Sequence, residues 1–118
     1  MKTNVGIDIE SVERFQKMIS KEKLLKNIFS EEEYQYAINK VNTAQSLTGI
    51  WCAKEAVIKS FSSIKLLTIR EVAVICKKDT APKASINFSF EKEFKYDLAI
   101  SISHTKDYAT AISILTVY

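Results

Sequence analysis

The sequence predicts an α+β fold, because the spacing of its apolar residues changes halfway along the chain. Between Phe15 and Phe61 the apolar residues recur mainly at helical intervals. From Val72 onward they alternate with polar residues, as they do in strands that are buried on one face. One alternating segment, residues 4–10, precedes the helices. A strand, then helices, then an antiparallel meander predict an antiparallel sheet packed on a long central helix.

The opening segment is predicted to be a half-buried strand. Its β-branched residues fall on one side of an extended chain, and the long helix is expected to cover the apolar side of the sheet. The other side carries a glycine and two carboxylates. The two sides consist of Val5, Ile7 and Ile9, and of Gly6, Asp8 and Glu10.

Three helical segments are expected between this strand and the meander. Ser30 followed by Glu33 forms a capping box, which marks the start of a helix. Asn42 or Thr43 supplies the N-cap of the next and longest helix. The segments are residues 11–28, with an apolar stripe of Phe15, Met18 and Ile19, then residues 31–40, and then residues 44–61.

Four strand segments are expected in the second half of the chain. Pro82 lies in the turn between the first two, and residues 105–107 join the last two as a hairpin. The alternating residues are Val72, Val74 and Cys76; Ile86, Phe88 and Phe90; Leu98, Ile100 and Ile102, up to His104; and the apolar positions of residues 108–115.

Length and composition predict one domain spanning residues 1–118. The chain has a mass of 13.4 kDa, 47% hydrophobic residues and 26% charged residues, which excludes intrinsic disorder. No apolar run approaches the ~20 residues of a membrane helix, and the N-terminus lacks a secretion signal. Cys52 and Cys76 have neither metal-ligand spacing nor a disulfide framework. We therefore expect a reduced, cytoplasmic protein without a membrane partner.

The net charge of +3 is too small to indicate nucleic-acid binding by itself, but the basic residues are unevenly distributed. The segment from Arg14 to Lys26 contains five basic residues and a single acidic residue, Glu22. Two interpretations are open: a solvated helix face, or a docking surface for an acidic partner. An RNA-binding module is the less favoured reading, because stacking aromatics are not interleaved with these basic residues.

The long helix carries charges on or beside its apolar face. At ~100° per residue, Lys54 projects from the middle of that face, and Glu55 and Lys59 border it at i,i+4 spacing. This pattern fits a structural ion pair and a lysine that extends its ammonium group to solvent. It also fits a functional site, because the opening strand brings Asp8 and Glu10 to the same helix.

If these carboxylates converge with Glu55, their chemistry suits Mg²⁺, which takes few protein ligands and completes its shell with water and phosphate oxygens. Lys54 and Lys59 would then face phosphate oxygens, the arrangement used in phosphoryl transfer. His104, the only histidine, is in phase with the apolar residues of its strand. It is either a satisfied core residue, or an anion ligand or proton relay at the strand end.

Three segments in this order resemble the 4'-phosphopantetheinyl transferase superfamily, in its single-domain holo-[acyl-carrier-protein] synthase type. They are Gly-Ile-Asp-Ile-Glu at 6–10, Trp-Cys-Ala-Lys-Glu-Ala-Val-Ile-Lys at 51–59, and Ser-Ile-Ser-His at 101–104. The resemblance implies the corresponding fold and a Mg²⁺-dependent transferase. Such an enzyme moves the 4'-phosphopantetheine group of coenzyme A to a serine of an apo acyl carrier protein, and it releases adenosine 3',5'-bisphosphate. It also implies a homotrimer with active sites between protomers.

The resemblance assigns roles to individual residues. Asp8 and Glu55 would hold Mg²⁺, and Glu55 would help to deprotonate the serine through a water molecule. Lys59 would neutralise charge on the diphosphate, and Lys54 would support the phosphate end. Two further assignments are Glu10 as an additional metal ligand, as in the longer members, and Ser103 and His104 from a neighbouring protomer at the 3'-phosphate ribose end.

Some positions depart from the family pattern. Ile50 stands where an arginine is common, and residues 60–63 replace a glycine-rich turn. A catalytically silent module that binds carrier protein or coenzyme A is therefore the alternative to the enzyme. Because carrier proteins are acidic, the basic segment is expected to be their docking face, through Arg14, Lys17 and Lys21 at i, i+3 and i+7.

Overall fold

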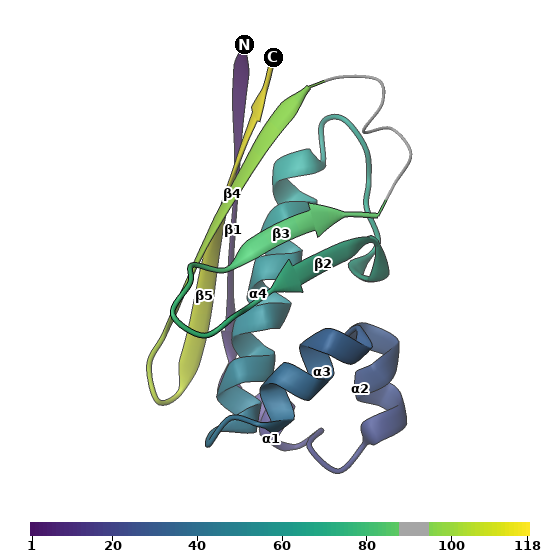
Figure 1. Ribbon diagram of the computed structural model, residues 1–118, viewed down its shortest axis with the longest axis vertical. Helices are drawn as coiled ribbons and strands as arrows, with labels where there is room; N and C mark the ends of the chain where they lie inside the picture. Colours follow the sequence, from purple (N-terminus) through teal and green to yellow (C-terminus); the bar gives the residue numbers. More distant parts are fainter. Residues whose placement is uncertain (88–94) are drawn as a thin grey trace.

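A computed structural model describes residues 1–87 and 95–118, arranged as an α+β fold around helix α4 (Figure 1). A three-stranded antiparallel sheet lies along one side of α4, and the short helices and a β-hairpin lie on its other sides. The elements are β1 (Lys2–Ser11), α1 (Val12–Gln16), α2 (Glu22–Ile28), α3 (Glu31–Ile38), α4 (Thr43–Phe61), a 3-10 turn η1 (Ile69–Glu71), β2 (Val72–Ile75), β3 (Lys83–Ile86), β4 (Tyr96–His104) and β5 (Tyr108–Val117).

The strand order β1-β5-β4 decides where the predicted site residues lie. Strand β5 is central, and it pairs with β1 from Ser11↔Tyr108 onward and with β4 from His104↔Ala109 onward. Asp8 on β1 and His104 on β4 therefore belong to opposite edges of this sheet.

The sheet face that contacts α4 is lined by small residues. Gly6 is buried there, and a Cβ atom at this position would lie 1.9 Å from the carbonyl oxygen of Ala56. Ala109, Ala111 and Ser113 of β5 are buried on the same face, and the Ser113 hydroxyl lies 3.0 Å from that of Ser60. These small side chains allow the helix to approach the sheet closely.

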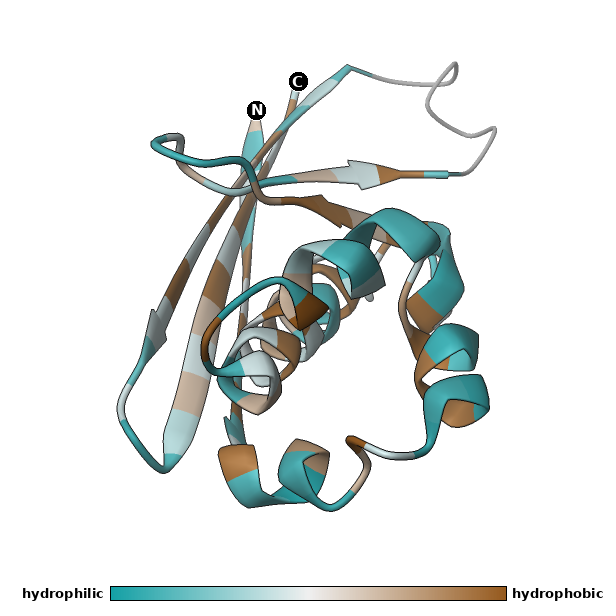
Figure 2. Cartoon of the chain, turned by 60° about the horizontal axis from the view of Figure 1, so that its bottom comes forward, coloured by the Kyte–Doolittle hydropathy of each residue, from teal (hydrophilic) through white to brown (hydrophobic). Residues whose placement is uncertain are grey.

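The opposite face of the sheet is apolar and open to solvent, contrary to the sequence-based expectation for β1. Val5, Ile7 and Ile9 are 58%, 62% and 66% exposed, and Ile112 and Ile114 of β5 are exposed as well. The hydrophobic bands on the strands are visible in Figure 2. The close approach of α4 excludes β-branched side chains, so the helix covers the glycine side of β1 instead.

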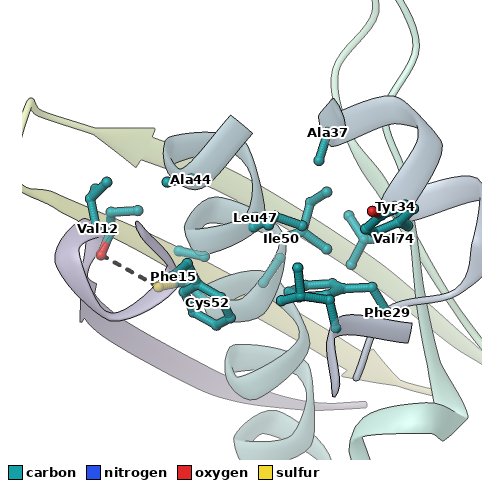
Figure 3. Packing of buried hydrophobic residues seen from close by; sticks show 14 of the residues in the cluster. Val12, Phe15, Phe29, Tyr34, Ala37, Ala44, Leu47, Ile50, Cys52 and Val74 are labelled. Atoms are coloured by element: carbon teal, nitrogen blue, oxygen red, sulfur yellow. Dashed lines mark hydrogen bonds between the residues drawn. The ribbon is translucent and has the colours of Figure 1, made fainter. Parts of the chain in front are cut away.

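The main core lies between α4 and the short helices. Phe15 of α1 packs edge-on against Phe29 (centroids 5.7 Å apart) and lies 5.8 Å from the Trp51 ring. Leu47 and Ile50 of α4 complete this contact, and Figure 3 shows them between Phe29 and Ala44. The aromatic contacts hold the N-terminal helices against α4.

Several predicted boundaries are confirmed and others need correction. Ser30 and Glu33 form the predicted capping box, and the Asn42 side chain accepts a hydrogen bond from the Gln45 amide (3.0 Å) as the N-cap of α4. Helix α3 ends at Ile38, two residues before the prediction. In the predicted strand of Ile86, Phe88 and Phe90, the first residue ends β3, and the two phenylalanines lie outside the described residues.

The basic segment does not form one continuous helix. Helix α1 ends at Gln16, Lys17 is its C-cap residue, and Lys21 precedes α2. The expected i, i+3, i+7 stripe of Arg14, Lys17 and Lys21 is therefore wrong as a helical arrangement. In the described parts of the chain, no helix is long and apolar enough to cross a membrane.

Candidate active site

Strand β1 and helix α4 bring Asp8 and Lys59 together. The Lys59 Nζ atom lies 3.2 Å from Asp8 Oδ1 and donates a hydrogen bond to the Ile7 carbonyl at 2.8 Å. The Lys59 side chain is 52% exposed, whereas that of Asp8 is 16% exposed. Lys59 thus lies on the solvent side of the largely buried Asp8 carboxylate.

The second oxygen of this carboxylate has no hydrogen-bond partner among the described residues. Asp8 Oδ2 is buried, and the neighbouring Cys52 thiol instead donates to the Ala109 carbonyl oxygen at 3.4 Å (Figure 3). Burial, and after it the charge of Asp8, raise the pKa of Cys52 to about 12, so the thiol stays protonated. A buried anionic oxygen without a donor is unfavourable, and a cation at this position would satisfy it.

Glu55 lies one helical turn before Lys59, beside Asp8. Partial burial raises the pKa of the Glu55 carboxyl, and the negative charges of Asp8 and Glu10 raise it further. The charges of Lys59 and Arg14 act in the opposite direction. This mutual repulsion indicates that the carboxylates share one region, where a divalent cation would stabilise their charged forms.

Glu10 already has a cationic partner in the protein. Its Oε2 atom lies 3.3 Å from the Arg14 guanidinium, which in turn stacks over Trp51 at 4.5 Å from the ring centroid. Within the described ranges, no three potential ligands are arranged to hold a metal ion. The side chains that fit Mg²⁺ are therefore Asp8 and Glu55, two carboxylates that leave room for water and phosphate oxygens.

Lys54 has a structural position, which corrects the expectation that it faces phosphate. Its Nζ atom lies 2.8 Å from Glu33 Oε1 and donates to the carbonyls of Val72 (2.5 Å) and Ile69 (3.3 Å). The side chains of Lys54 and Glu33 are each only 1% exposed. Burial lowers the pKa of Lys54, against the opposing effect of Glu33. Its ammonium group is enclosed by protein oxygens and is not presented to solvent.

The partner of Lys54 was not identified from the sequence. Glu33 also accepts hydrogen bonds from the backbone amides of Ser30 (2.8 Å) and Val74 (2.7 Å), so it connects α3, α4 and β2. The capping box was a visible signal for Glu33, but it explains only the bond to Ser30. Pairing across 21 residues has no local sequence signature.

A cleft of about 200 Å³ lies at the other edge of the sheet. His104 and Ile102 of β4 line it together with the first turns of α4 and the connection between β2 and β3. Ile50, at the position where an arginine is common, is one of the lining residues from α4. Ser103 does not line the cleft, because alternation along β4 turns its side chain to the other face. Sequence reasoning missed Tyr36 and Lys77, which line the cleft from distant parts of the chain.

The site residues thus form two groups in one chain. Asp8, Glu55 and Lys59 lie at the β1 edge, and His104 and its cleft lie at the β4 edge. The first group provides carboxylates and an exposed ammonium group for a metal and phosphates. The second provides an aromatic, apolar and hydroxyl-lined hollow suited to a nucleotide-sized group.

The fold and the paired carboxylates define a protein class that comparison with known proteins makes explicit. The family model described as "ACPS: 4'-phosphopantetheinyl transferase superfamily" matches residues 4–113. The chain belongs to this superfamily of transferases.

Individual relatives match over nearly their whole length. The holo-[acyl-carrier-protein] synthase of Thermodesulfovibrio yellowstonii is 37% identical over 114 residues, which cover 95% of this chain and 96% of the relative. The corresponding protein of Finegoldia magna is 32% identical over 116 residues, covering 98% and 97%. Among solved structures, the Chronobacterium ammoniagenes ACPS-CoA complex superposes with a TM-score of 0.83 at 27% identity, covering 100% of this chain and 99% of that one.

Proposed function

We propose that this protein is a Mg²⁺-dependent holo-[acyl-carrier-protein] synthase, which transfers 4'-phosphopantetheine from coenzyme A to a serine of an apo acyl carrier protein. The observation that carries this proposal is the buried Asp8 Oδ2, which has no hydrogen-bond partner in residues 1–87 and 95–118, beside Glu55 and the exposed Lys59. Membership in the superfamily and the match to synthases over the whole chain support the same reaction. Two free cysteines fit a reducing, cytoplasmic location.

Asp8 and Glu55 would hold Mg²⁺, which when bound withdraws charge from the diphosphate of coenzyme A. Lys59 is held by an exposed ion pair with Asp8 and by the Ile7 carbonyl, and an ammonium group has three donors, so one N–H remains for a phosphate oxygen. The serine hydroxyl attacks the phosphorus that carries pantetheine, and the bond to the adenosine 3',5'-bisphosphate leaving group breaks. Glu55, which lies beside the metal and the reacting phosphate, accepts the serine proton through a water molecule.

The nucleotide end of coenzyme A occupies the His104 cleft of a neighbouring copy. The two site groups belong to opposite edges of the sheet, so a shared site joins unlike surfaces of two protomers. When the rotation between copies closes, such head-to-tail contacts form rings, and the homotrimer implied by the family resemblance is a ring of this kind. The exposed apolar face formed by Val5, Ile7, Ile9, Ile112 and Ile114 provides surface for this association.

The acidic carrier docks on the basic side chains that follow β1. Arg14 is the key contact, because it lies between Glu10 and Trp51 and its charge reaches Glu55. Lys17 and Lys21 add exposed positive charge at the end of α1 and the start of α2. Replacing Arg14 by Glu should raise the apparent KM for carrier about tenfold or more and leave coenzyme A affinity unchanged. Equal losses for both substrates, or an unchanged KM, would contradict this docking face.

A direct test is to incubate the protein with coenzyme A, Mg²⁺ and an apo acyl carrier protein and to measure the carrier mass. A phosphopantetheine-sized increase that requires Mg²⁺ supports the enzyme. Binding of carrier or coenzyme A without any increase supports the silent module that Ile50 and residues 60–63 left open. Sedimentation of the protein alone tests the trimer, and a monomer at assay concentration would refute it.

A further inference from the structure

Glu10 lies on the side of β1 that faces α4, in phase with Asp8. In the register of the sheet, Asp8 is opposite Ala111 and Glu10 is opposite Ala109, two buried residues of β5. Two residues along a strand span ~6.6 Å, so the two carboxylates start from neighbouring positions on one face. The negative charge of Glu10 also acts on Glu55. Glu10 is therefore within electrostatic reach of both carboxylates that fit Mg²⁺.

In the free protein the charge of Glu10 is balanced by Arg14. Glu10 Oε2 accepts a hydrogen bond from Arg14 Nη1 at 3.3 Å, and the two side chains are 24% and 43% exposed. This is a single contact between partly exposed groups, and the guanidinium group has four further N–H donors. Such pairs contribute little to stability, so a partner that binds the guanidinium group more strongly can displace Glu10.

Two aromatic rings hold the Arg14 guanidinium group independently of Glu10. The guanidinium carbon lies 4.5 Å from the centroid of Trp51 and 5.4 Å from that of Phe15. Arg14 therefore stays beside α4 when Glu10 is displaced. A carboxylate that meets the edge of a guanidinium group forms two parallel hydrogen bonds, which bind more strongly than the single contact with Glu10. An acidic carrier supplies such carboxylates.

A displaced Glu10 would change the metal site. Asp8 Oδ2 has no donor, and no three potential ligands are arranged around a metal position, among the residues that the structure describes. An additional negative charge beside Asp8 and Glu55 would strengthen the binding of a divalent cation. We propose that Glu10 exchanges partners: it pairs with Arg14 in the free protein and adds its charge to the metal site when a carrier carboxylate binds Arg14. This inference rests on the proposed function, because it takes the docked partner to be an acidic carrier.

The exchange couples the carrier surface to the metal site. Carrier binding strengthens metal binding, and metal binding strengthens carrier binding by the same factor, because such a coupling is reciprocal. Couplings between two sites in proteins are commonly about 5- to 150-fold in affinity. The metal site would thus reach its full negative charge only when the acceptor serine is present.

A general electrostatic effect has to be separated from this exchange. An acidic carrier attracts cations whether or not Glu10 is present, and loss of the Arg14 charge favours a cation in either case. The exchange differs because both effects then depend on Glu10. A double-mutant cycle isolates this dependence. A salt concentration of about 0.15 M reduces the general effect, because it screens exposed charges that are more than ~8 Å apart.

The first experiment measures Mn²⁺ binding by electron paramagnetic resonance, without carrier or coenzyme A. Mn²⁺ takes the same oxygen ligands as Mg²⁺. Arg14→Gln releases Glu10 and should tighten Mn²⁺ binding about fivefold or more. In a Glu10→Gln background the same substitution should change the affinity by about twofold or less. Arg14→Lys, which keeps a charge beside Glu10, should bind Mn²⁺ like the wild type. Equal effects of Arg14→Gln in both backgrounds would overturn the proposal.

Glu22 and Lys26 on α2 provide a matched control. They form another i,i+4 pair, with a distance of 3.0 Å and both side chains exposed. Neither residue is assigned to the metal or to the carrier. Lys26→Gln removes the same charge from the protein as Arg14→Gln, and it should leave the Mn²⁺ affinity within about twofold of the wild type. An effect as large as that of Arg14→Gln would show that net charge controls the metal, which contradicts the exchange.

The second experiment adds an apo acyl carrier protein whose acceptor serine is replaced by alanine, so that no transfer occurs. Saturating carrier should tighten Mn²⁺ binding to the wild type about fivefold or more, and to Glu10→Gln by about twofold or less. Equal Mn²⁺ affinity of the wild type with and without bound carrier would refute the exchange, even if the unaltered carrier is modified. A Glu10-dependent effect of Arg14→Gln in the first experiment supports the exchange even if no carrier is modified.

Discussion

Helix α4 contributes two lysine–carboxylate pairs that differ in every physical respect except their charges. Lys54 and Glu33 are each 1% exposed, lie 2.8 Å apart, and are surrounded by further hydrogen bonds. Lys59 and Asp8 lie 3.2 Å apart with 52% and 16% exposure, and one carboxylate oxygen has no donor among the described residues. We call the Lys54–Glu33 pair complete, because protein groups satisfy its charges and hydrogen bonds. We call the Lys59–Asp8 pair incomplete, because Asp8 Oδ2 has no donor in the described part of the chain.

This difference separates structure from chemistry within one motif. A buried pair is costly to break, because the remaining charge has neither water nor a partner. An exposed pair contributes little to stability, so its members exchange partners easily. The Trp-x-x-Lys-Glu-Ala-x-x-Lys motif therefore contains one lysine that connects α4 to α3 and β2, and one lysine available to a substrate.

The largest expected effect concerns Glu55, which lies between the two lysines. Glu55→Gln should reduce kcat for carrier modification by about 10³-fold or more, ~4 kcal/mol, because it removes the proposed metal ligand and proton acceptor. Its circular dichroism spectrum should remain that of the wild type. Glu22→Gln, which removes an exposed pair with Lys26, serves as the control. A Glu55→Gln variant with near-normal kcat would refute the metal assignment.

Breaking the complete pair should change stability instead of chemistry. Lys54→Met leaves Glu33 buried without its counter-charge and should lower the free energy of unfolding by ~3–5 kcal/mol. Urea titration followed by tryptophan fluorescence measures this, since the partly buried Trp51 packs against the core that α4 forms. The double variant Glu33→Gln/Lys54→Met should recover part of the loss. If Lys54→Met unfolds at the wild-type urea concentration, the buried pair does not stabilise the fold.

Breaking the incomplete pair should have the opposite pattern. Lys59→Met should reduce kcat/KM with coenzyme A about 100-fold, ~2.7 kcal/mol, because it removes the positive charge that stabilises the phosphate during transfer. Its free energy of unfolding should change by less than about 1 kcal/mol. Steady-state kinetics measures kcat/KM, and urea titration of the same preparation measures the free energy of unfolding. A large loss of stability with intact kcat/KM would reverse the roles assigned to the two lysines.

The sequence indicated that Asp8 and Lys59 lie near one site, although not that they pair, and it gave no indication of the contact between Lys54 and Glu33. Asp8 on an alternating strand and Lys59 at i+4 from Glu55 are local patterns, and their chemistry indicated a common site. The contact between Lys54 and Glu33 depends on how α3 packs against α4, which neither segment encodes alone. A lysine in the middle of an apolar helix face was consistent with snorkelling, with phosphate binding and with a buried ion pair.

The orientation of β1 shows the same limit. Alternation correctly identified the strand and separated Val5, Ile7 and Ile9 from Gly6 and Asp8. It did not indicate which side faces α4, because that depends on the distance between helix and sheet. At this distance only a residue without a Cβ atom, Gly6, fits against the Ala56 carbonyl. The apolar side of β1 therefore faces away from α4 and is exposed.

The smallest expected effect is a pH dependence of stability that arises from Glu55, beside the incomplete pair. Burial and the charge of Asp8 raise the pKa of Glu55, so the folded state holds a proton that the unfolded state has already released. The stabilising contribution of this proton is complete below the ordinary value of about 4.5 and is lost as the pH rises through the raised pKa. Glu55→Gln carries no such proton. In EDTA, the variant should match the wild type near pH 4 and exceed its unfolding free energy by less than about 1 kcal/mol at pH 7. Urea titrations across this range check the trend, and a variant less stable than the wild type at pH 7 would show that Glu55 stabilises the fold as an anion.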